Sequence, residues 1–382
     1  MQIRNRIKEA KRIVFKFGTN VLTRDDGNIA LARIYSFIES LSDLKKKNKE
    51  IIIVTSGAVG LGSKKLKLKS KPSIVSLKQA CAAVGQGRLM YLYEEGFDKF
   101  DILTAQVLLT EDDFSIRKKY LNLRNTLNEL LEHGVIPIIN QNDTVCCSEI
   151  ECFDSDGIKV CFGDNDKLAA LVVSKLDADL LVILSDINGL FDHDPRTNPD
   201  AKLIPVIEEV THEVEALGFE ASKRGRGGMR TKLEAAKVVS RSGGIALIAN
   251  GKLPNIIDRI FKGEELGTVF LPKEHLSSKK RWIGYATNIT GKIKINSGAK
   301  RALIEKNASL LPAGIMEIKN KFNEGDVVSI IDEAGVEFAK GMVNYSSIDC
   351  KKIVGKQSNE IENILGHKNY DAVITRDNIV IL

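Results

Sequence analysis

The sequence lacks any run of about 18 apolar residues, the length that a membrane-spanning helix needs. Its basic start leads into an apolar stretch that Lys16 interrupts, and this stretch is too short for the core of a secretory signal. The six cysteines do not form the regular framework of a small secreted protein, and the five histidines stand too far apart for a helix-borne zinc motif. We therefore expect a cytoplasmic protein that enters no membrane and has no metal site of its own.

A strong bias of charge is also absent. The formal net charge is +6 over 382 residues and is spread along the chain, unlike the concentrated charge of a dedicated nucleic-acid binder. Hydrophobic residues make up 43% and charged residues 28%, which is close to the average of globular proteins and excludes a largely disordered chain. A chain of this length exceeds one compact core, so we expect two domains.

Five short β-branched runs alternate with longer helical patterns in the first 270 residues. The runs are continuously apolar, as buried parallel strands are, and cover residues 13–17, 51–55, 135–139, 180–184 and 245–248. Between them lie stripes of helical spacing, such as Leu31, Ile34, Ile38 and Leu41, and a later stripe that ends at Gly134. This alternation predicts a doubly wound α/β sandwich with a mainly parallel sheet, in which ligands bind beyond the carboxyl ends of the strands.

The pattern changes near Pro272. Residues 273–280 are polar and indicate a linker between a first domain at 1–272 and a second at 281–382. Beyond the linker come short alternating segments punctuated by turn residues, beginning at Gly291, Gly325 and Gly335. They predict a small β-barrel-like domain with one or two helices.

Lys16 lies at the end of the first predicted strand, just before Gly18. A lysine inside an apolar strand is costly to bury without a partner. With Gly18 it can bring an ammonium group and backbone N–H groups to an anion. The alternative is an ordinary turn with a surface lysine.

Small residues follow the second predicted strand, beginning at Ser56 and Gly57. The segment is not a Walker A loop, because residues 62–64 are Gly-Ser-Lys where that motif needs Gly-Lys-Ser or Gly-Lys-Thr. Small side chains still let a ligand approach the backbone amides closely.

Asn and Asp gather in two further loops. One runs from Asn140 to Asp143, and the other contains Asp164, Asn165 and Asp166. These residues are typical of turns, with Asp166 capping a helix that begins at residue 167. They are equally the side chains that the ammonium and carboxylate groups of a polar substrate require.

Two segments near the later strands suit a nucleotide. Ser185 and Asp186 follow the fourth strand. Glycines then lead into a helix, where N–H groups, the positive end of the helix dipole and an ammonium group form a phosphate cradle. The cradle consists of Arg226, Gly227, Gly228, Met229, Arg230, Thr231 and Lys232. As an RNA-binding RGG tract it is a poor match, being a single copy.

Six segments, taken in order, resemble the amino-acid kinase family. They are Lys16-Phe-Gly-Thr, Thr-Ser56-Gly-Ala, Asn-Gln-Asn-Asp143, Gly-Asp164-Asn165-Asp166, Ser-Asp186-Ile-Asn-Gly-Leu and Gly-Gly-Met-Arg-Thr-Lys232. Each is weak alone, but six in order are specific. The part beyond the linker is similar to a PUA domain, above all at residues 309–315, so the resemblance covers nearly the whole chain.

The resemblance is to those family members that use ATP to phosphorylate the side-chain carboxylate of L-glutamate. It implies γ-glutamyl phosphate as product, as in the first step of proline biosynthesis, and Mg²⁺ shielding the phosphates of ATP. Lys16 and Lys232 would flank the transferred group, with Asp166 between them. Implied glutamate-binding residues are Ser56, Gly57, Asp143, Asp164 and Asn165. Implied nucleotide-binding residues are Lys16, Gly18, Ser185, Asp186, Arg226, Gly227, Gly228, Met229, Arg230, Thr231 and Lys232.

The resemblance also implies partners. Proline is expected as a feedback inhibitor, and the chain is expected to form a homo-oligomer. Acetylglutamate kinase, aspartokinase and carbamate kinase are the alternatives within the fold. An RNA-binding protein acting through the PUA-like domain is the alternative outside it, and the weak charge of that domain disfavours RNA binding.

The sequence departs from the family pattern at four places. Gln141 stands where Glu is usual, Ser185 where Thr is common and Arg226 where Thr often occurs. The larger departure is residues 148–162, about ten residues longer than expected and bordered by cysteines. The spacing of Cys146, Cys147, Cys152 and Cys161 lacks the paired arrangement of a structural zinc site. Reduced thiols are expected, with a redox or metal role as the alternative.

Overall fold

The computed structural model describes residues 2–70, 72–145, 165–218, 228–273, 283–284 and 289–382. The chain divides into two compact units, Met1–His275 and Leu276–Leu382. The expected domain bounds of 1–272 and 281–382 stay a prediction, and most of the expected linker lies outside the described residues. Within the described part, no helix combines the length and apolar character needed to cross a bilayer.

The first unit is built on an eight-stranded sheet with the order β3-β4-β2-β1-β5-β7-β8-β6. Its strands are β1 (Arg12–Phe17), β2 (Glu50–Thr55), β3 (Thr104–Leu109), β4 (Ile136–Gln141), β5 (Leu180–Ser185), β6 (Val206–Ile207), β7 (Ile245–Asn250) and β8 (Thr268–Phe270). Neighbouring strands are parallel except at β7 and β8, which are antiparallel. The five strands expected from the sequence are confirmed.

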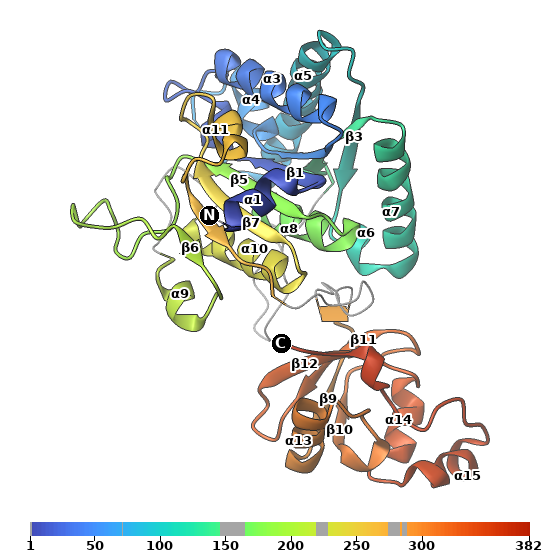
Figure 1. Ribbon diagram of the computed structural model, residues 1–382. Helices are drawn as coiled ribbons and strands as arrows, with labels where there is room; N and C mark the ends of the chain where they lie inside the picture. Colours follow the sequence, from blue (N-terminus) through green and yellow to red (C-terminus); the bar gives the residue numbers. More distant parts are fainter. Residues whose placement is uncertain (1, 71, 146–164, 219–227, 274–282, 285–288) are drawn as a thin grey trace. The chain divides into compact units, whose positions relative to one another are not determined.

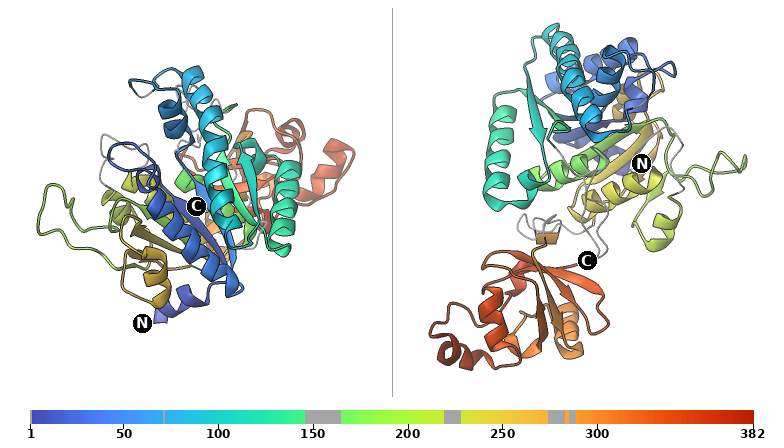
Figure 2. Two further views of the ribbon diagram at one scale, coloured as in Figure 1. Left: turned by 90° about the horizontal axis from the view of Figure 1, so that it is seen from above. Right: turned by 180° about the vertical axis from the view of Figure 1, so that it is seen from behind.

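Helices cover both faces of this sheet, which confirms the doubly wound sandwich. Figures 1 and 2 show α3, α5 and α11 on one face and α7, α8 and α10 on the other. The helices are α1 (Gln2–Glu9), α2 (Thr19–Leu22), α3 (Leu31–Lys46), α4 (Ala58–Lys65), α5 (Val75–Asp98), α6 (Asp112–Ser115), α7 (Arg117–Glu132), α8 (Asn165–Leu176), α9 (His212–Ala216), α10 (Met229–Arg241) and α11 (Ile256–Lys262). Gly134, with φ +74°, ends the α7 stripe as expected.

The alternation of side chains along β1 decides where Lys16 points. Ile13, Phe15 and Phe17 belong to the apolar core that also contains Ile34 and Ile38 of α3. Successive side chains of a strand point to opposite faces, so Lys16 projects toward the other layer, where α8 contacts β1. One polar residue in the strand therefore lies on the α8 face while the core on the α3 face stays apolar.

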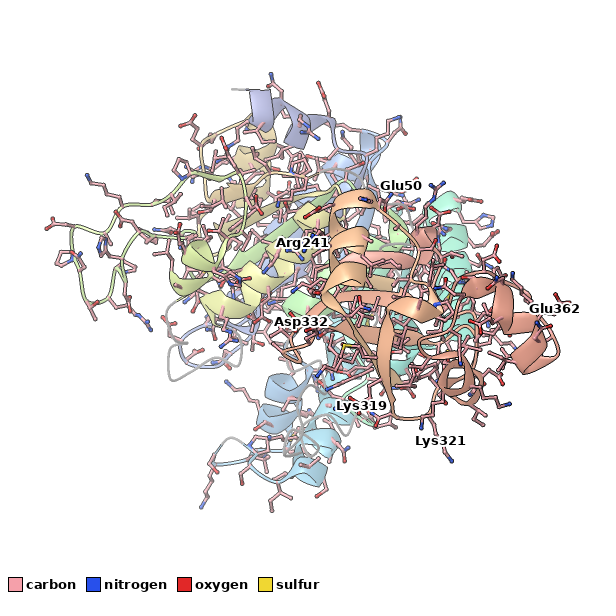
Figure 3. The ribbon with its side chains drawn as sticks, turned by 90° about the horizontal axis from the view of Figure 1, so that it is seen from below. Glu50, Arg241, Lys319, Lys321, Asp332 and Glu362 are labelled. Carbon is pink, nitrogen blue, oxygen red and sulfur yellow. The ribbon has the colours of Figure 1, made fainter. Side chains whose placement is uncertain are left out.

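The second unit contains a five-stranded mixed sheet with the order β10-β9-β11-β12-β13. Its strands are β9 (Gly291–Ile295), β10 (Ile315–Lys319), β11 (Val327–Ile331), β12 (Glu337–Met342) and β13 (Ile379–Ile381), and its helices are α13 (Ser297–Lys306), α14 (Ser347–Ile353) and α15 (Ile361–Leu365). β9 and β11 are parallel and the other pairs are antiparallel. Asn296 caps α13, and Lys300 of this helix pairs with Asp332 at 2.7 Å (Asp332 is labelled in Figure 3).

Candidate active site

Two lysines share one buried carboxylate at the centre of the first unit. Lys16 Nζ lies 2.6 Å from Asp166 Oδ1, and Lys232 Nζ lies 3.2 Å from Asp166 Oδ2. The Asp166 side chain is 0% exposed, and the two lysine side chains are 6% and 5% exposed. Three residues that are distant in the sequence thus form one ion-paired cluster, called here the Lys–Asp–Lys triad.

The fold explains how the triad assembles. Lys16 comes from the carboxyl end of β1, Asp166 from the first turn of α8 and Lys232 from the first turns of α10. The structure corrects one expectation, because α8 begins at Asn165 and Asp166 lies inside it instead of capping a helix from residue 167. The carboxylate is held by the lysines, so it remains near the positive end of the α8 dipole without acting as a cap.

The electrostatics of the triad favour the charged state of Asp166. Burial alone would raise the pKa of its carboxyl group, but attraction to Lys16 and Lys232, and hydrogen bonds from both, outweigh that effect. The pKa of Asp166 therefore lies well below its ordinary value. Two ammonium groups against one carboxylate leave a net positive charge in a place that water reaches poorly, which attracts anions.

The start of α10 adds donors beside the triad. Thr231 Oγ1 lies 3.1 Å from Asp166 Oδ2 and 3.0 Å from the Gly228 carbonyl oxygen. Lys232 Nζ also donates to the Gly228 carbonyl at 3.3 Å. Gly228 is the N-cap and has no side chain to bond the first turn, and the first N–H groups of a helix have no partner within it. The helix start can therefore receive an anion.

A chain of three side-chain amides runs away from the triad. Asn165 Nδ2 donates to the Thr55 carbonyl at 2.7 Å, to Ser56 Oγ at 2.9 Å and to Asn140 Oδ1 at 3.1 Å. Asn140 Nδ2 in turn donates to Gln86 Oε1 at 2.9 Å. Gln86 Nε2 is buried and, among the described residues, has no hydrogen-bond partner. An unpaired buried donor costs about 1–3 kcal/mol, so this amide calls for a reason.

The turn after β2 places Ser56 beside this amide chain. Gly57 has φ +103°, a left-handed conformation that glycine adopts without strain, and α4 begins directly after it. Thr55, at the end of β2, is 3.0 Å from the hydroxyl of Tyr93 on α5 through its Oγ1. Ser56 and Gly57 therefore lie in a tight turn between the buried strand β2 and the start of α4.

Asp186 forms a second polar cluster at the carboxyl end of the sheet. Asn20 Nδ2 donates to Asp186 Oδ2 at 2.8 Å, and Ser185 Oγ donates to Oδ1 at 3.2 Å. Partial desolvation raises the pKa of Asp186, but the hydrogen bonds lower it by more than desolvation raises it. The pKa of Asp186 therefore lies below its ordinary value. The backbone N–H of Gly18 donates to the Leu184 carbonyl at 3.1 Å, so this donor already has a partner, and the expected role of Gly18 at the nucleotide stays a prediction.

The remaining expected residues are only partly placed. Asp143 lies two residues beyond β4 and is half-buried, and Met229 and Arg230 open α10. Asp164, Arg226, Gly227, the segment 148–162 and its cysteines lie outside the described residues. The residues that the sequence analysis did not single out are Gln86, Tyr93 and Asn20. The first two lie seven positions apart on α5, and this spacing on one helix face was the available signal.

A cavity of about 340 Å³ lies beyond the ends of β1 and β7 but contains none of the expected site residues. Arg24, Arg33 and Lys252 line it, together with apolar side chains from the start of α3 and from the turn before α11. Arg33 already donates to the Val21 carbonyl at 2.6 Å. The cavity is therefore separate from the triad.

Known proteins resemble this chain along nearly its whole length. Residues 11–249 match the amino acid kinase family, and residues 291–365 match the PUA domain. A glutamate 5-kinase of Caldanaerobacter subterraneus subsp. tengcongensis is 48% identical over 373 residues, which are 97% of this chain and 98% of that protein. Glutamate 5-kinases of Moorella thermoacetica and Methanosarcina acetivorans are 44% and 46% identical, each over 98% of this chain and 97% of the relative.

Proposed function

The chain belongs to the amino acid kinase family, among the glutamate 5-kinases. We propose how its site phosphorylates glutamate. The enzyme transfers the γ-phosphoryl group of ATP to the side-chain carboxylate of L-glutamate. The product is γ-glutamyl phosphate, and the reaction opens proline biosynthesis. The Lys–Asp–Lys triad is the observation that carries the proposed mechanism.

The triad fits the electrostatic problem of this reaction. A carboxylate is already a nucleophile, so no base is required. The difficulty is bringing one anion against another and stabilising the charge that spreads over the transferred phosphoryl group. Lys16 and Lys232 approach Asp166 from its two oxygens, which keeps the ammonium groups apart and in fixed positions. We assign Lys16 and Lys232 to the transferred group and Asp166 to their positioning.

The amide chain and the β2 turn support a glutamate site beside the triad. Asn165 directly precedes Asp166 on α8 and touches Ser56, so both lie close to where the reacting carboxylate must be. We assign Ser56, Gly57 and Asn165 to glutamate, with Asp143 as the acceptor for its ammonium group. Asp164 belongs to the same proposal, although it lies outside the described residues.

The nucleotide is proposed to bind between the Asp186 cluster and the start of α10. Gly18, Ser185 and Asp186 would line one side, and residues 226–232 would hold the phosphates at the helix start. Both oxygens of Asp166 face lysines, so this carboxylate is not an open metal ligand. Mg²⁺ would accordingly be held by phosphate oxygens and water and would neutralise charge on the phosphates.

Four further properties belong to the same proposal. Proline is proposed as a feedback inhibitor because it is the end product of the pathway that this reaction opens. A homo-oligomer and a cytoplasmic location are proposed from the family. The PUA domain is proposed to serve the enzyme instead of RNA, because no strong positive charge favours nucleic acid.

An assay of ADP release with ATP and Mg²⁺ tests the function. L-Glutamate, L-aspartate, N-acetyl-L-glutamate and carbamate are compared, and hydroxylamine traps any acyl phosphate. L-Glutamate should give both ADP and a hydroxamate. If another acid does so and L-glutamate does not, the substrate assignment is wrong and the corresponding family alternative replaces it.

A further inference from the structure

The close packing of α4 and α5 holds Gln86 against Asn140, in the amide chain beside the proposed glutamate site. A Cβ atom at Gly62 of α4 would lie 1.8 Å from the Cys81 carbonyl oxygen, and one at Gly85 of α5 would lie 1.8 Å from the Ala58 carbonyl oxygen. The two backbones therefore touch at both places. Gln86 follows directly after the second contact and is only 8% exposed.

The orientation of the three amides follows from two backbone groups. The Thr55 carbonyl can only accept, so the Asn165 group that meets it at 2.7 Å is the NH₂ group. The Gln141 N–H can only donate, so the Asn140 atom 2.9 Å away is its oxygen. Asn140 must then present its NH₂ group to Gln86, which must answer with Oε1. The NH₂ group of Gln86 therefore takes no part in the hydrogen bonds of the amide chain.

This NH₂ group is a buried donor without a partner among the described residues. A position designed only to hold Asn140 needs an acceptor alone, which a carboxylate or a backbone carbonyl also supplies. An amide supplies the acceptor and adds a donor. The extra donor belongs to the last amide of the chain, counted from Asn165 beside Asp166.

We propose that Gln86 is a substrate-binding residue whose Nε2 donates a hydrogen bond to the α-carboxylate of glutamate, while its Oε1 fixes Asn140. This rests on the proposed function. Of the three charged groups of glutamate, the reacting carboxylate belongs beside the triad and the ammonium group beside Asp143. The α-carboxylate is the anion that remains to be matched, and a buried N–H donor is the group that matches it.

Gln86→Glu separates the two functions of the side chain, because it keeps an acceptor for Asn140 and replaces the donor with an oxygen of the same size. The KM for L-glutamate should rise roughly tenfold to a hundredfold, as for the loss of a hydrogen bond to a charged group. The kcat and the KM for ATP should stay unchanged. The inhibition constant of 4-aminobutanoate, which is glutamate without its α-carboxylate, should change far less than the KM for glutamate.

Gln106→Glu is the matched control, since it makes the same change at an exposed position of β3. It should leave every constant unchanged. Gln86→Met, which conserves volume and removes the donor, repeats the comparison if Gln86→Glu does not fold by circular dichroism. The proposal would be overturned if the KM for glutamate and the inhibition constant of 4-aminobutanoate rose equally, or if neither changed. A parallel rise in the KM for ATP would also overturn it.

The wild-type enzyme is assayed first with L-glutamate, which separates the two proposals. If the wild type does not phosphorylate L-glutamate, the proposed function fails. If it does and the Gln86 variants bind glutamate and 4-aminobutanoate as the wild type does, only the assignment of Gln86 fails.

Discussion

The two ends of α8 contact the same face of β1 through different polar interactions, a hydrogen bond from Arg12 at one end and an ion pair of Lys16 at the other. At the amino end of β1, Arg12 donates to the Leu176 carbonyl at the end of α8, and its Nε lies 2.6 Å from Glu50 Oε2 (Glu50 is labelled in Figure 3). At the carboxyl end, Lys16 pairs with Asp166 in the first turn of α8. The distances are equal, but the Arg12 and Glu50 side chains are 23% and 39% exposed while the triad is nearly dry.

This difference in burial separates a structural pair from a chemical one. Solvent screens the outer pair, Arg12–Glu50, and such exposed pairs contribute about 0–1 kcal/mol to the free energy of unfolding. The inner carboxylate carries a desolvation cost that its attraction to the lysines must offset, so it is a poor device for stability. Asp179 also satisfies backbone groups at the amino end of β1, because its Oδ2 accepts hydrogen bonds from the N–H groups of Lys11 and Arg12. At the amino end of β1 the polar groups are paired with one another, whereas at its carboxyl end the triad keeps a net positive charge that a ligand can neutralise.

Removing the central carboxylate should give the largest effect. Asp166→Asn leaves two buried ammonium groups without their counter-charge, so the free energy of unfolding should fall by about 3–5 kcal/mol. Glu50→Gln, the matched change at the outer pair, should lower it by about 0–1 kcal/mol. Urea unfolding followed by circular dichroism measures both. Equal losses in the two variants would show that burial does not separate the two pairs.

The pH dependence sharpens this test. The pKa of Asp166 is depressed in the folded enzyme, so its contribution to stability is present above the ordinary aspartate pKa of about 3.9 and is lost as pH falls toward the folded-state value. The stability difference between the wild type and Asp166→Asn should therefore be constant near neutral pH and shrink below about pH 4. A difference that grows on acidification would contradict the assigned charge.

The lysines of the triad should affect turnover more than the outer arginine does. Lys16→Ala and Lys232→Ala each remove a positive charge from the place where negative charge develops, so kcat should fall by about 10²–10³. Arg12→Ala, four residues from Lys16 on the same face of β1, should leave kcat unchanged. Steady-state kinetics at saturating ATP and glutamate decide this, and a comparable loss in Arg12→Ala would mean that the triad acts only through folding.

Asp143→Ala should have a smaller effect, confined to one substrate. The carboxylate is assigned to the ammonium group of glutamate, which does not take part in the transfer. The KM for glutamate should therefore rise while the KM for ATP and kcat change little. A selective rise in the KM for ATP would place Asp143 at the nucleotide instead.

Truncation near residue 275 should have the smallest effect on chemistry. All eight strands of the first sheet lie before this point, and the backbone N–H of Lys273 donates to the Ser240 carbonyl at 2.8 Å. The shortened chain should be soluble, folded and active with the KM values of the full chain. An insoluble or inactive product, with the full chain active, would show that the PUA domain completes the enzyme or its assembly.

The sequence revealed the parts of the molecule in which local pattern and chemistry agree. The five apolar strands were recognisable because they are buried on both faces, and Lys16 was noticeable because it interrupts one of them. The half-exposed strand β3, and the very short β6 and β8, carry no such pattern. Gln86 and Tyr93 were missed because two polar residues on a long helix resemble any solvated face until the helix is packed against β2 and β4.

The contact between α4 and α5 has a consequence for how this protein can vary. At Gly62 and Gly85 the space that a side chain would need is filled by backbone oxygen atoms of the neighbouring helix, which cannot shrink or rotate away. Any replacement there must spread two helices that carry the β2 turn and Gln86. Exposed positions of α5 can accept other side chains, but Gly62 and Gly85 must remain glycine for the two helices to keep this packing and hold Gln86 and the β2 turn in place.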